Sequence, residues 1–132
     1  MKYVSEPLRV KYSDTDQMGF MHHSNYLRFF ENARISWLRE LGISYKKMEE
    51  DGVIMPVVSS HLKHIKPSFF DDQLFIEISI IKPPKASLDF SYVVFNQNKD
   101  LICEGFTKLA FLNSKSQKPI RCPDFVYNLF VE

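Results

Sequence analysis

The longest hydrophobic repeat in the chain has the period of a helix. Between Tyr26 and Leu41, apolar side chains recur at spacings of three and four residues, with mostly polar side chains between them. This spacing predicts an amphipathic helix of about five turns with one apolar face. Ser24 or Asn25 can cap its start, and Gly42 stands where it would end. The apolar face consists of Tyr26, Phe29, Phe30, Ala33, Trp37 and Leu41, and the polar positions include Arg28, Glu31, Asn32, Arg34, Arg39 and Glu40.

Most of the remaining sequence alternates between apolar and polar positions, which is the period of a β-strand. Leu8, Val10 and Tyr12 follow this alternation and indicate a first strand before the helix. One long helix combined with hairpin-linked strands predicts an α+β fold, in which an antiparallel sheet wraps around the helix. After the helix we expect a short helical segment over Tyr45–Glu50, strands over 53–65, 74–80, 88–94 and 101–112, and a hairpin loop over Asn96–Asp100.

The composition is typical of a single soluble domain. The chain has 132 residues, 45% of them hydrophobic, and a formal net charge of +1. This length suits one domain, and the near-neutral charge argues against a general nucleic-acid binder, which carries a basic surplus. No apolar run is long enough to cross a bilayer, and the first residues lack the apolar stretch of a signal peptide. Cys103 and Cys122 are too few for a disulfide scaffold, so we expect a cytoplasmic protein without membrane insertion.

The densest group of polar residues lies between the first strand and the long helix. It contains two carboxylates, Asp14 and Asp16, and two of the four histidines, His22 and His23. One interpretation is a solvated loop whose side chains bond nearby backbone amides and cap the helix. A metal site is a weaker interpretation, because adjacent histidines at a helix start point in different directions and no further ligand spacing completes a shell. The catalytic motif of aspartyl-phosphate-forming phosphatases also begins with Asp-x-Asp. That class requires a parallel-sheet domain with a helix after each strand, and this sequence predicts only one long helix.

A family resemblance favours catalysis in this loop. The motif that carries it consists of Asp14-Thr15-Asp16, Gly19, His22-His23, Tyr26 and Glu31-Asn32-Ala33-Arg34. This motif resembles the signature of the hotdog-fold acyl-CoA thioesterases of the 4-hydroxybenzoyl-CoA thioesterase family, in particular the YbgC-like branch. The resemblance implies a single hotdog domain over residues 1–132, with an antiparallel sheet wrapped around one long central helix. It also implies hydrolysis of an acyl-CoA to free acid and coenzyme A, with no cofactor beyond the coenzyme A of the substrate.

The resemblance further implies which residues form the site. The second aspartate of the family motif is the catalytic carboxylate and corresponds to Asp16, which would act as nucleophile or general base. The family helix begins seven residues later, so the backbone N–H of His23 would polarise the thioester carbonyl. In the YbgC-like branch a tyrosine and a histidine side chain are also used, and their places are held by Tyr12 and His23.

Coenzyme A carries phosphates, so cationic side chains are expected beside it. Lys82 and Lys85 are the first candidates, placed between two strands where the family often has basic residues, and Lys63 and Lys66 are the second. A charged surface turn is an equally good interpretation of the Lys82–Lys85 segment. His61 and His64, on a predicted strand, are expected at the surface or in a subunit interface.

The resemblance also implies an oligomer. Hotdog domains form homodimers with a continuous sheet and sites between subunits, and a pair of such dimers gives a homotetramer. Twelve Phe and six Tyr in so short a chain exceed what one small core hides, which also favours a subunit interface.

The motif departs from the YbgC-like branch at two positions and leaves other functions open. His22 stands where the branch more often has tyrosine, and Met18 replaces a small residue, so short-chain substrates do not follow from the resemblance. The alternatives are a thioesterase for acyl carrier protein, a hotdog hydratase or dehydratase, and a non-catalytic module that holds an acyl ligand. Neither the acyl group nor the physiological pathway follows from the sequence, because the pocket floor is shaped by residues such as Phe29, Phe30 and Met55 in ways that one sequence does not define.

Overall fold

The computed structural model describes residues 1–131 and contains one long helix and eight strands. A short 3₁₀ turn at Tyr12–Asp14 leads into the loop before the long helix. The helices are α1 (Ser24–Glu40), α2 (Tyr45–Glu50) and α3 (Asp124–Tyr127), and the strands are β1 (Lys2–Val4), β2 (Leu8–Arg9), β3 (Val53–Ile54), β4 (Val57–His64), β5 (Gln73–Ser79), β6 (Ser87–Asn96), β7 (Leu101–Ala110) and β8 (Leu112–Asn113).

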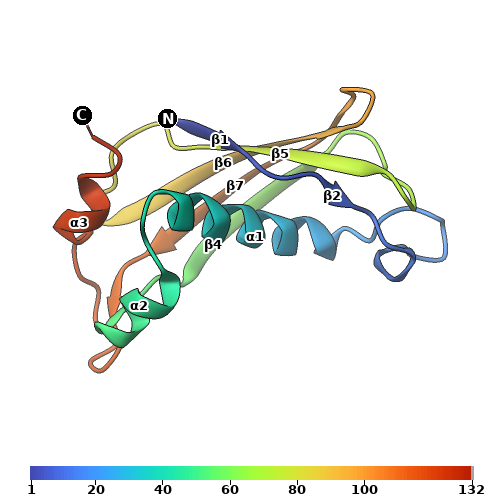
Figure 1. Cartoon of the computed structure of the whole chain (residues 1–132). Coiled ribbons are helices and arrows are strands. Elements are labelled where there is room, and N and C mark those ends of the chain that lie inside the picture. The colour runs from blue at the N-terminus through green and yellow to red at the C-terminus, as the bar shows by residue number, and fades with distance from the viewer. Residues whose placement is uncertain (132) are drawn as a thin grey trace.

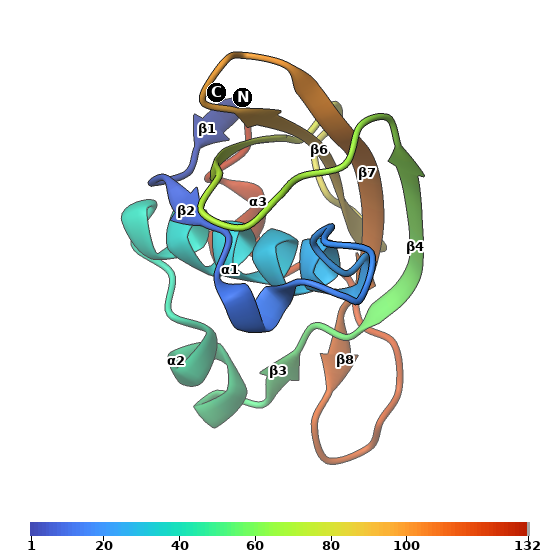
Figure 2. The same cartoon turned by 90° about the vertical axis from the view of Figure 1, so that its right-hand side faces the viewer.

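Six of the strands form one antiparallel sheet in the order β1-β5-β6-β7-β4, with β2 also paired to β5. The helix α1 lies along one face of this sheet (Figure 1), and the strands curve around it when the molecule is viewed from the side (Figure 2). β3 and β8 form a separate two-stranded sheet below the start of β4 (Figure 2). The expected α+β architecture, an antiparallel sheet wrapped around one long helix, is confirmed.

The core lies between the apolar face of α1 and the inward positions of the sheet. Phe30, in the middle of α1, is fully buried and stacks on Tyr92 of β6 with ring centroids 4.1 Å apart. Each large apolar side chain buried in this way stabilises the fold by roughly 1.5–3 kcal/mol. The inward positions of β5 and β6, and Ile80 directly after β5, agree with the predicted alternation and are all buried: Leu74, Ile76, Ile78, Ile80, Leu88, Phe90, Tyr92 and Val94.

The predicted first strand is wrong at its end. The sequence indicates a strand through Tyr12, whereas the structure has β2 only at Leu8–Arg9, and Tyr12 already begins the 3₁₀ turn. Val10 is fully buried, and its amide and carbonyl bond to Asp72 and Asp71 instead of continuing the ladder with β5. An additional strand, β1, pairs with β5 from Ser79 to Glu77.

The predicted strand over 53–65 is in fact two strands in different sheets. β3 ends at Ile54 and β4 begins at Val57, and Pro56 lies between them. Proline has no amide hydrogen to donate to a ladder, so it interrupts the pairing. The predicted strand over 101–112 likewise divides into β7 and β8, and α3 was not predicted.

Two predictions about the ends of the helices are confirmed and one is wrong. Gly42 follows the end of α1 with a positive φ of 95°, which glycine adopts without strain, and α2 covers the expected Tyr45–Glu50. The start of α1 differs, because the N-cap residue is His23 and no side chain caps it. Ser24 and Asn25 lie inside the first turn.

The apolar face of α1 is wider than the sequence pattern indicates. Arg34 was placed among its polar positions, but it is 4% exposed and faces the sheet. Its Nη1 donates to the hydroxyl of Tyr92 at 3.2 Å. No helix within residues 1–131 is long and apolar enough to span a membrane.

Candidate active site

A tight loop before α1 holds the carboxylate of Asp16. Oδ1 of Asp16 accepts hydrogen bonds from the amides of Met18, at 2.9 Å, and Phe20, at 3.3 Å. The Asp16 amide donates to the Phe20 carbonyl, and Gly19, with a φ of 85°, closes the turn. A non-glycine residue would be strained at that φ. Because Oδ1 is held by the backbone while Oδ2 accepts no hydrogen bond from residues 1–131, one carboxylate oxygen is left for a ligand.

The N-cap residue of α1, His23, has a free backbone amide within residues 1–131, whereas the amides on either side of it are bonded. His22 donates its own amide to the Asp14 carbonyl at 2.8 Å, and its Nδ1 accepts from the Ser24 amide at 3.2 Å. The Asn25 amide donates back to the His22 carbonyl. The amide of His23 has no acceptor in the part of the chain that the structure describes. It lies at the positive end of the helix dipole, which suits a developing negative charge.

Asp16 and His23 line the same cavity, which has a volume of about 270 Å³. It lies between the loop, the first turn of α1 and the end of β4, where His64 and Lys66 contribute. The other lining residues are Met18, Phe20, Met21, Tyr26, Ile65 and Pro67. The structure thus brings Asp16, His23 and Lys66 to the lining of one mainly apolar pocket.

Asp14, the first carboxylate of the motif, has a structural role. Its side chain is 7% exposed and accepts from Arg28 Nη2 at 2.8 Å and from the Lys11 amide at 2.9 Å. The Asp14 carbonyl accepts from Asn25 Nδ2 at 2.9 Å. The interpretation of this loop as bonding to nearby backbone amides therefore holds for Asp14, which fastens the loop to α1.

Tyr26 and His64 were not among the predicted site residues, and both line the cavity. The Tyr26 hydroxyl is 2.8 Å from the hydroxyl of Ser68, and both side chains are buried. Burial raises the pKa of Tyr26, despite the opposing effect of that hydrogen bond. The ring of His64 lies 5.4 Å from that of Tyr26 and 6.3 Å from that of His23. No local pattern in the sequence indicates these contacts, because they join residues about forty positions apart.

The remaining predicted site residues lie at different distances from the cavity. Tyr12 is 78% exposed, packs edge-to-face on Phe70 and does not line the cavity. Lys66 lines it, with Nζ 3.8 Å from Asp100, whereas Lys63 is an exposed residue of β4.

Lys82 and Lys85 lie at the other end of the same subunit. Lys82 Nζ is 3.8 Å from Asp89, and the Lys85 carbonyl accepts from the Cys122 amide shortly before α3. In Figure 1 their loop, between β5 and β6, lies beside the chain termini, while α1 begins at the opposite end. Within one chain these two lysines and Asp16 do not share a pocket.

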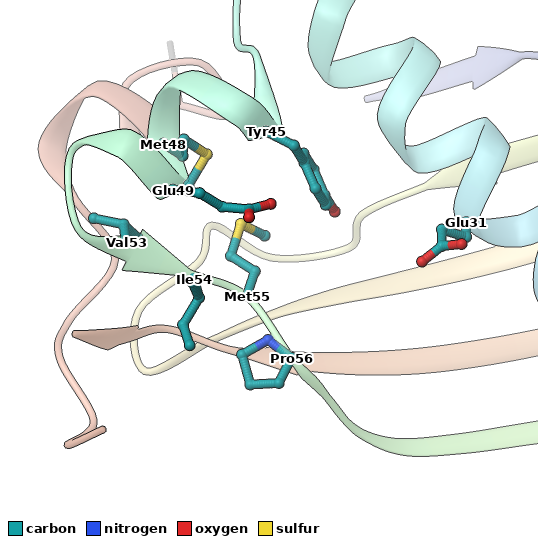
Figure 3. A pocket seen from close by; sticks show the side chains of 8 residues that line it. All are labelled: Glu31, Tyr45, Met48, Glu49, Val53, Ile54, Met55 and Pro56. Carbon is teal, nitrogen blue, oxygen red and sulfur yellow. The ribbon is translucent and has the colours of Figure 1, made fainter. Parts of the chain in front are cut away.

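Two further cavities lie along α1. One, of about 320 Å³, is enclosed by α2, the β3 segment and Glu31 of α1, and Met55 is among its lining residues. Figure 3 shows Tyr45 and Glu31 on opposite sides of it. The other, of about 270 Å³, lies between α1 and β4 and is lined by Leu27, Arg28, Glu31, Arg34, Val57, Ser60 and Thr107. Glu31 borders both.

No group of three or more His, Cys, Asp or Glu side chains within residues 1–131 is placed to hold a metal ion. Cys103 and Cys122 are both free and buried. Burial raises the pKa of each thiol to about 11, so neither is a reactive thiolate near neutral pH.

Comparison with known proteins agrees with this geometry. The profile of the Thioesterase-like superfamily matches residues 10–130. The acyl-CoA thioesterase YbgC of Haemophilus influenzae is 29% identical over 127 residues, which cover 96% of this chain and 93% of that protein. YbgC of Escherichia coli O157:H7, an acyl-CoA thioester hydrolase, is 29% identical over 117 residues, covering 89% and 87%.

Solved structures show the same fold. The DHNA-CoA thioesterase of Staphylococcus aureus superposes with a TM-score of 0.86 at 30% identity, over 91% of this chain and 80% of that one. The resemblance expected from the sequence motif is therefore confirmed, and the chain belongs to the Thioesterase-like superfamily and has its hotdog fold.

Proposed function

We propose that this protein hydrolyses acyl-CoA thioesters at the cavity between the Asp16 loop and the start of α1. The observation that supports the proposal is one cavity lined by both Asp16, whose carboxylate is held by backbone amides, and His23, whose own amide has no acceptor in residues 1–131. The relatives that match nearly the whole chain are named acyl-CoA thioesterases, which favours this reaction over a hydratase or dehydratase.

Asp16 can act by either of two routes. As a nucleophile, Oδ2 adds to the thioester carbonyl carbon, the carbon–sulfur bond breaks, and water then cleaves the resulting mixed anhydride. As a general base, the carboxylate takes a proton from a water whose oxygen adds to the same carbon. In both routes coenzyme A leaves as a thiolate, and because an ordinary thiol has a pKa near 8.5, little acid assistance is needed.

The helix start provides the electrophilic half of the site. In the transition state the carbonyl oxygen becomes an oxyanion, and the His23 amide donates to it. One such donor contributes roughly 3–4 kcal/mol in other acyl-transfer enzymes. The side chains of His23 and Tyr12 are proposed as auxiliary groups, and no cofactor takes part in these steps.

We also propose that the active form is a homodimer or a homotetramer. β4 is an edge strand, and seven of its eight residues are exposed, including Val57 and Val58 at 47% and 56%. An unprotected edge of this length is a template for pairing with another chain. Pairing β4 with a second β4 would extend the sheet and would bring the Asp16 cavity, which borders His64, to the subunit boundary. Light scattering that gives a monomer at micromolar concentration would contradict this arrangement.

We propose that lysine side chains bind the phosphates of coenzyme A. Lys66 would do so at the cavity, and Lys63, Lys82 and Lys85 farther away. The last two would meet the substrate from a neighbouring subunit, since they lie far from Asp16 in their own chain. We place the reaction in the cytoplasm, which also suits two free thiols.

The test is a thiol-release assay on short, long and aromatic acyl-CoAs and on the matching acyl carrier protein thioesters. We expect Asp16→Asn to lower kcat by about 10²–10⁴-fold. The matched control is Asp51→Asn, which removes an exposed carboxylate beside Lys47 and should leave kcat unchanged. Parental activity in Asp16→Asn would overturn the assignment, and tight acyl-CoA retention without thiol release would indicate a binding module.

A further inference from the structure

The ring of His22, the residue before the N-cap of α1, forms hydrogen bonds that the proposed reaction does not use. Its Nδ1 accepts from the Ser24 amide at 3.2 Å and lies 2.8 Å from the Ser24 hydroxyl. A backbone amide can only donate, so Nδ1 carries no hydrogen and the ring is neutral, with its hydrogen on Nε2. The Ser24 hydroxyl therefore donates to the same nitrogen. His22 thus supplies an acceptor to the first amide of α1, a bond that the side chain of the N-cap residue, His23, does not make in residues 1–131.

The peptide unit that joins His22 to His23 is held on both sides. The His22 amide, in the unit before it, donates to the Asp14 carbonyl at 2.8 Å, and the Ser24 amide, in the unit after it, donates to the His22 ring. The carbonyl of the unit itself accepts from the Asn25 amide at 3.1 Å. No peptide bond in residues 1–131 is cis, and in a trans unit the carbonyl and the amide hydrogen point in opposite directions. The His23 amide therefore points out of the start of the helix.

The His22 ring also contacts the side chain of His23. The two rings are stacked, with centroids 4.3 Å apart and planes 28° from parallel. His23 lines the Asp16 cavity, whereas His22 is not among the described residues that line it. His22 therefore acts on the site through its neighbour, and it has two separable contacts for doing so: an acceptor for the Ser24 amide and a face for the His23 ring.

We propose that His22 is a positioning residue, whose neutral ring binds the Ser24 amide and thereby holds the His23 amide in the direction that the thioester oxygen requires. This inference rests on the proposed thioesterase function, in which the His23 amide donates to the oxyanion. The first amides of a helix have no acceptor within the helix, and helix ends fray. An acceptor on His22 keeps the first turn ordered at the point where the reaction needs a fixed donor.

Two substitutions separate the two contacts of His22. His22→Asn removes the ring but keeps an acceptor, since an asparagine side chain bonds the amide two residues on. His22→Phe keeps a ring that can stack on His23 but has no acceptor. We expect His22→Phe to lower kcat for acyl-CoA hydrolysis about tenfold with little change in KM, because an oxyanion donor worth roughly 10²–10³-fold is loosened and not removed. His22→Asn should retain most of the parental kcat.

The matched control is Ser116→Ala. The hydroxyl of Ser116 accepts from the Lys118 amide at 3.3 Å, which is a bond of the same spacing in an exposed loop after β8. Its removal should leave kcat unchanged. Parental kcat in both His22 variants would overturn the positioning role. So would an equal loss in both, or a loss confined to His22→Asn, since the acceptor would then not be the contact that matters.

Nuclear magnetic resonance without substrate separates this inference from the proposed function. The ring nitrogens of His22, assigned by their disappearance in His22→Phe, should show a bare Nδ1 and a protonated Nε2 at about pH 8, where an ordinary histidine is neutral. The Ser24 amide should exchange its hydrogen faster in His22→Phe than in the parental protein. A hydrogen on Nδ1, or unchanged exchange, would overturn the inference and leave the thioesterase function intact. Absence of thiol release from every acyl-CoA in the parental protein would instead overturn the proposed function, and His22 would then only order the helix start.

Discussion

Nη2 of Arg28 lies 2.8 Å from Oδ1 of Asp14, and this ion pair fastens the loop that carries Asp16 to the second turn of α1. The Asp14 side chain is buried, whereas that of Arg28 is half exposed, and the second oxygen of Asp14 accepts a hydrogen bond from the Lys11 amide. The position of Asp16 relative to the His23 amide therefore depends on a carboxylate two residues away that does not itself line the cavity.

Asp14→Asn should impair catalysis without removing a reacting group. The substitution keeps the shape of the side chain but weakens its bonds to Arg28 and Lys11, so the Asp16 loop is held less firmly. We expect kcat to fall by about tenfold to a hundredfold, since small displacements of a catalytic group have effects of this size. Steady-state thiol release measures this effect. Arg9→Gln, which removes the exposed pair with Asp71, is the control, and an Asp14→Asn variant as active as that control would contradict the positioning role.

Gly105→Ala should destabilise the fold. A Cβ on Gly105 of β7 would overlap Cε2 of Phe30 and approach its Cζ to 2.8 Å. Phe30 cannot move aside readily, because it is fully buried and stacked on Tyr92. Overpacking of this kind costs about 1–3 kcal/mol, which a denaturant titration can measure. Ser91→Ala on β6 should change the unfolding free energy far less, and equal effects of the two variants would count against this packing argument.

Lys66→Gln should weaken substrate binding more than it slows the chemical step. Lys66 lines the Asp16 cavity and has only a long contact, 3.8 Å, with Asp100, so its charge is available to a phosphate. We expect KM for an acyl-CoA to rise several-fold with little change in kcat, as for loss of uniform binding. The double substitution of Lys82 and Lys85 should also raise KM, in this case through the neighbouring subunit. An unchanged KM in either variant would reject the corresponding lysines.

The buried thiols predict a loss of stability at alkaline pH. Burial raises the pKa of Cys103 and Cys122 from the ordinary value of 9.0 to about 11. Between these values the unfolded chain loses its thiol protons while the folded protein keeps them, so the unfolding free energy should fall as the pH rises from about 9 to 11. Below pH 9 the thiols are protonated in both the folded and the unfolded protein, so they cause no loss of unfolding free energy there.

Chemical denaturation at a series of pH values measures this effect. Cys103→Ala should have a shallower fall than the parental protein over the same window, because one of the two titrating thiols is gone. Cys122 remains in that variant, so part of the dependence should persist. If the pH curves of the two proteins were parallel, Cys103 would not contribute.

The features that the sequence determined by itself are those that repeat locally. The helix from Tyr26 to Leu41 and the buried alternation of β5 and β6 follow from the spacing of apolar residues, since a helix and a strand each present one face to the core at a set period. Breaks in such patterns were harder to predict. Pro56 separates β3 from β4. The proline is visible in the sequence, but whether its missing amide hydrogen interrupts a ladder depends on the pairing partners, which the local pattern does not give.

The arrangement of the site was decided by the tertiary structure. Asp16 and His23 were identified from a motif, but their shared cavity with His64 requires the end of β4 to pack against the start of α1. Arg34 lies at a position that the helical pattern marks as polar, and it is buried because the sheet curves far enough to cover it. Burial of this kind depends on the partners that surround a residue, which are distant in the chain and set by how the sheet wraps the helix.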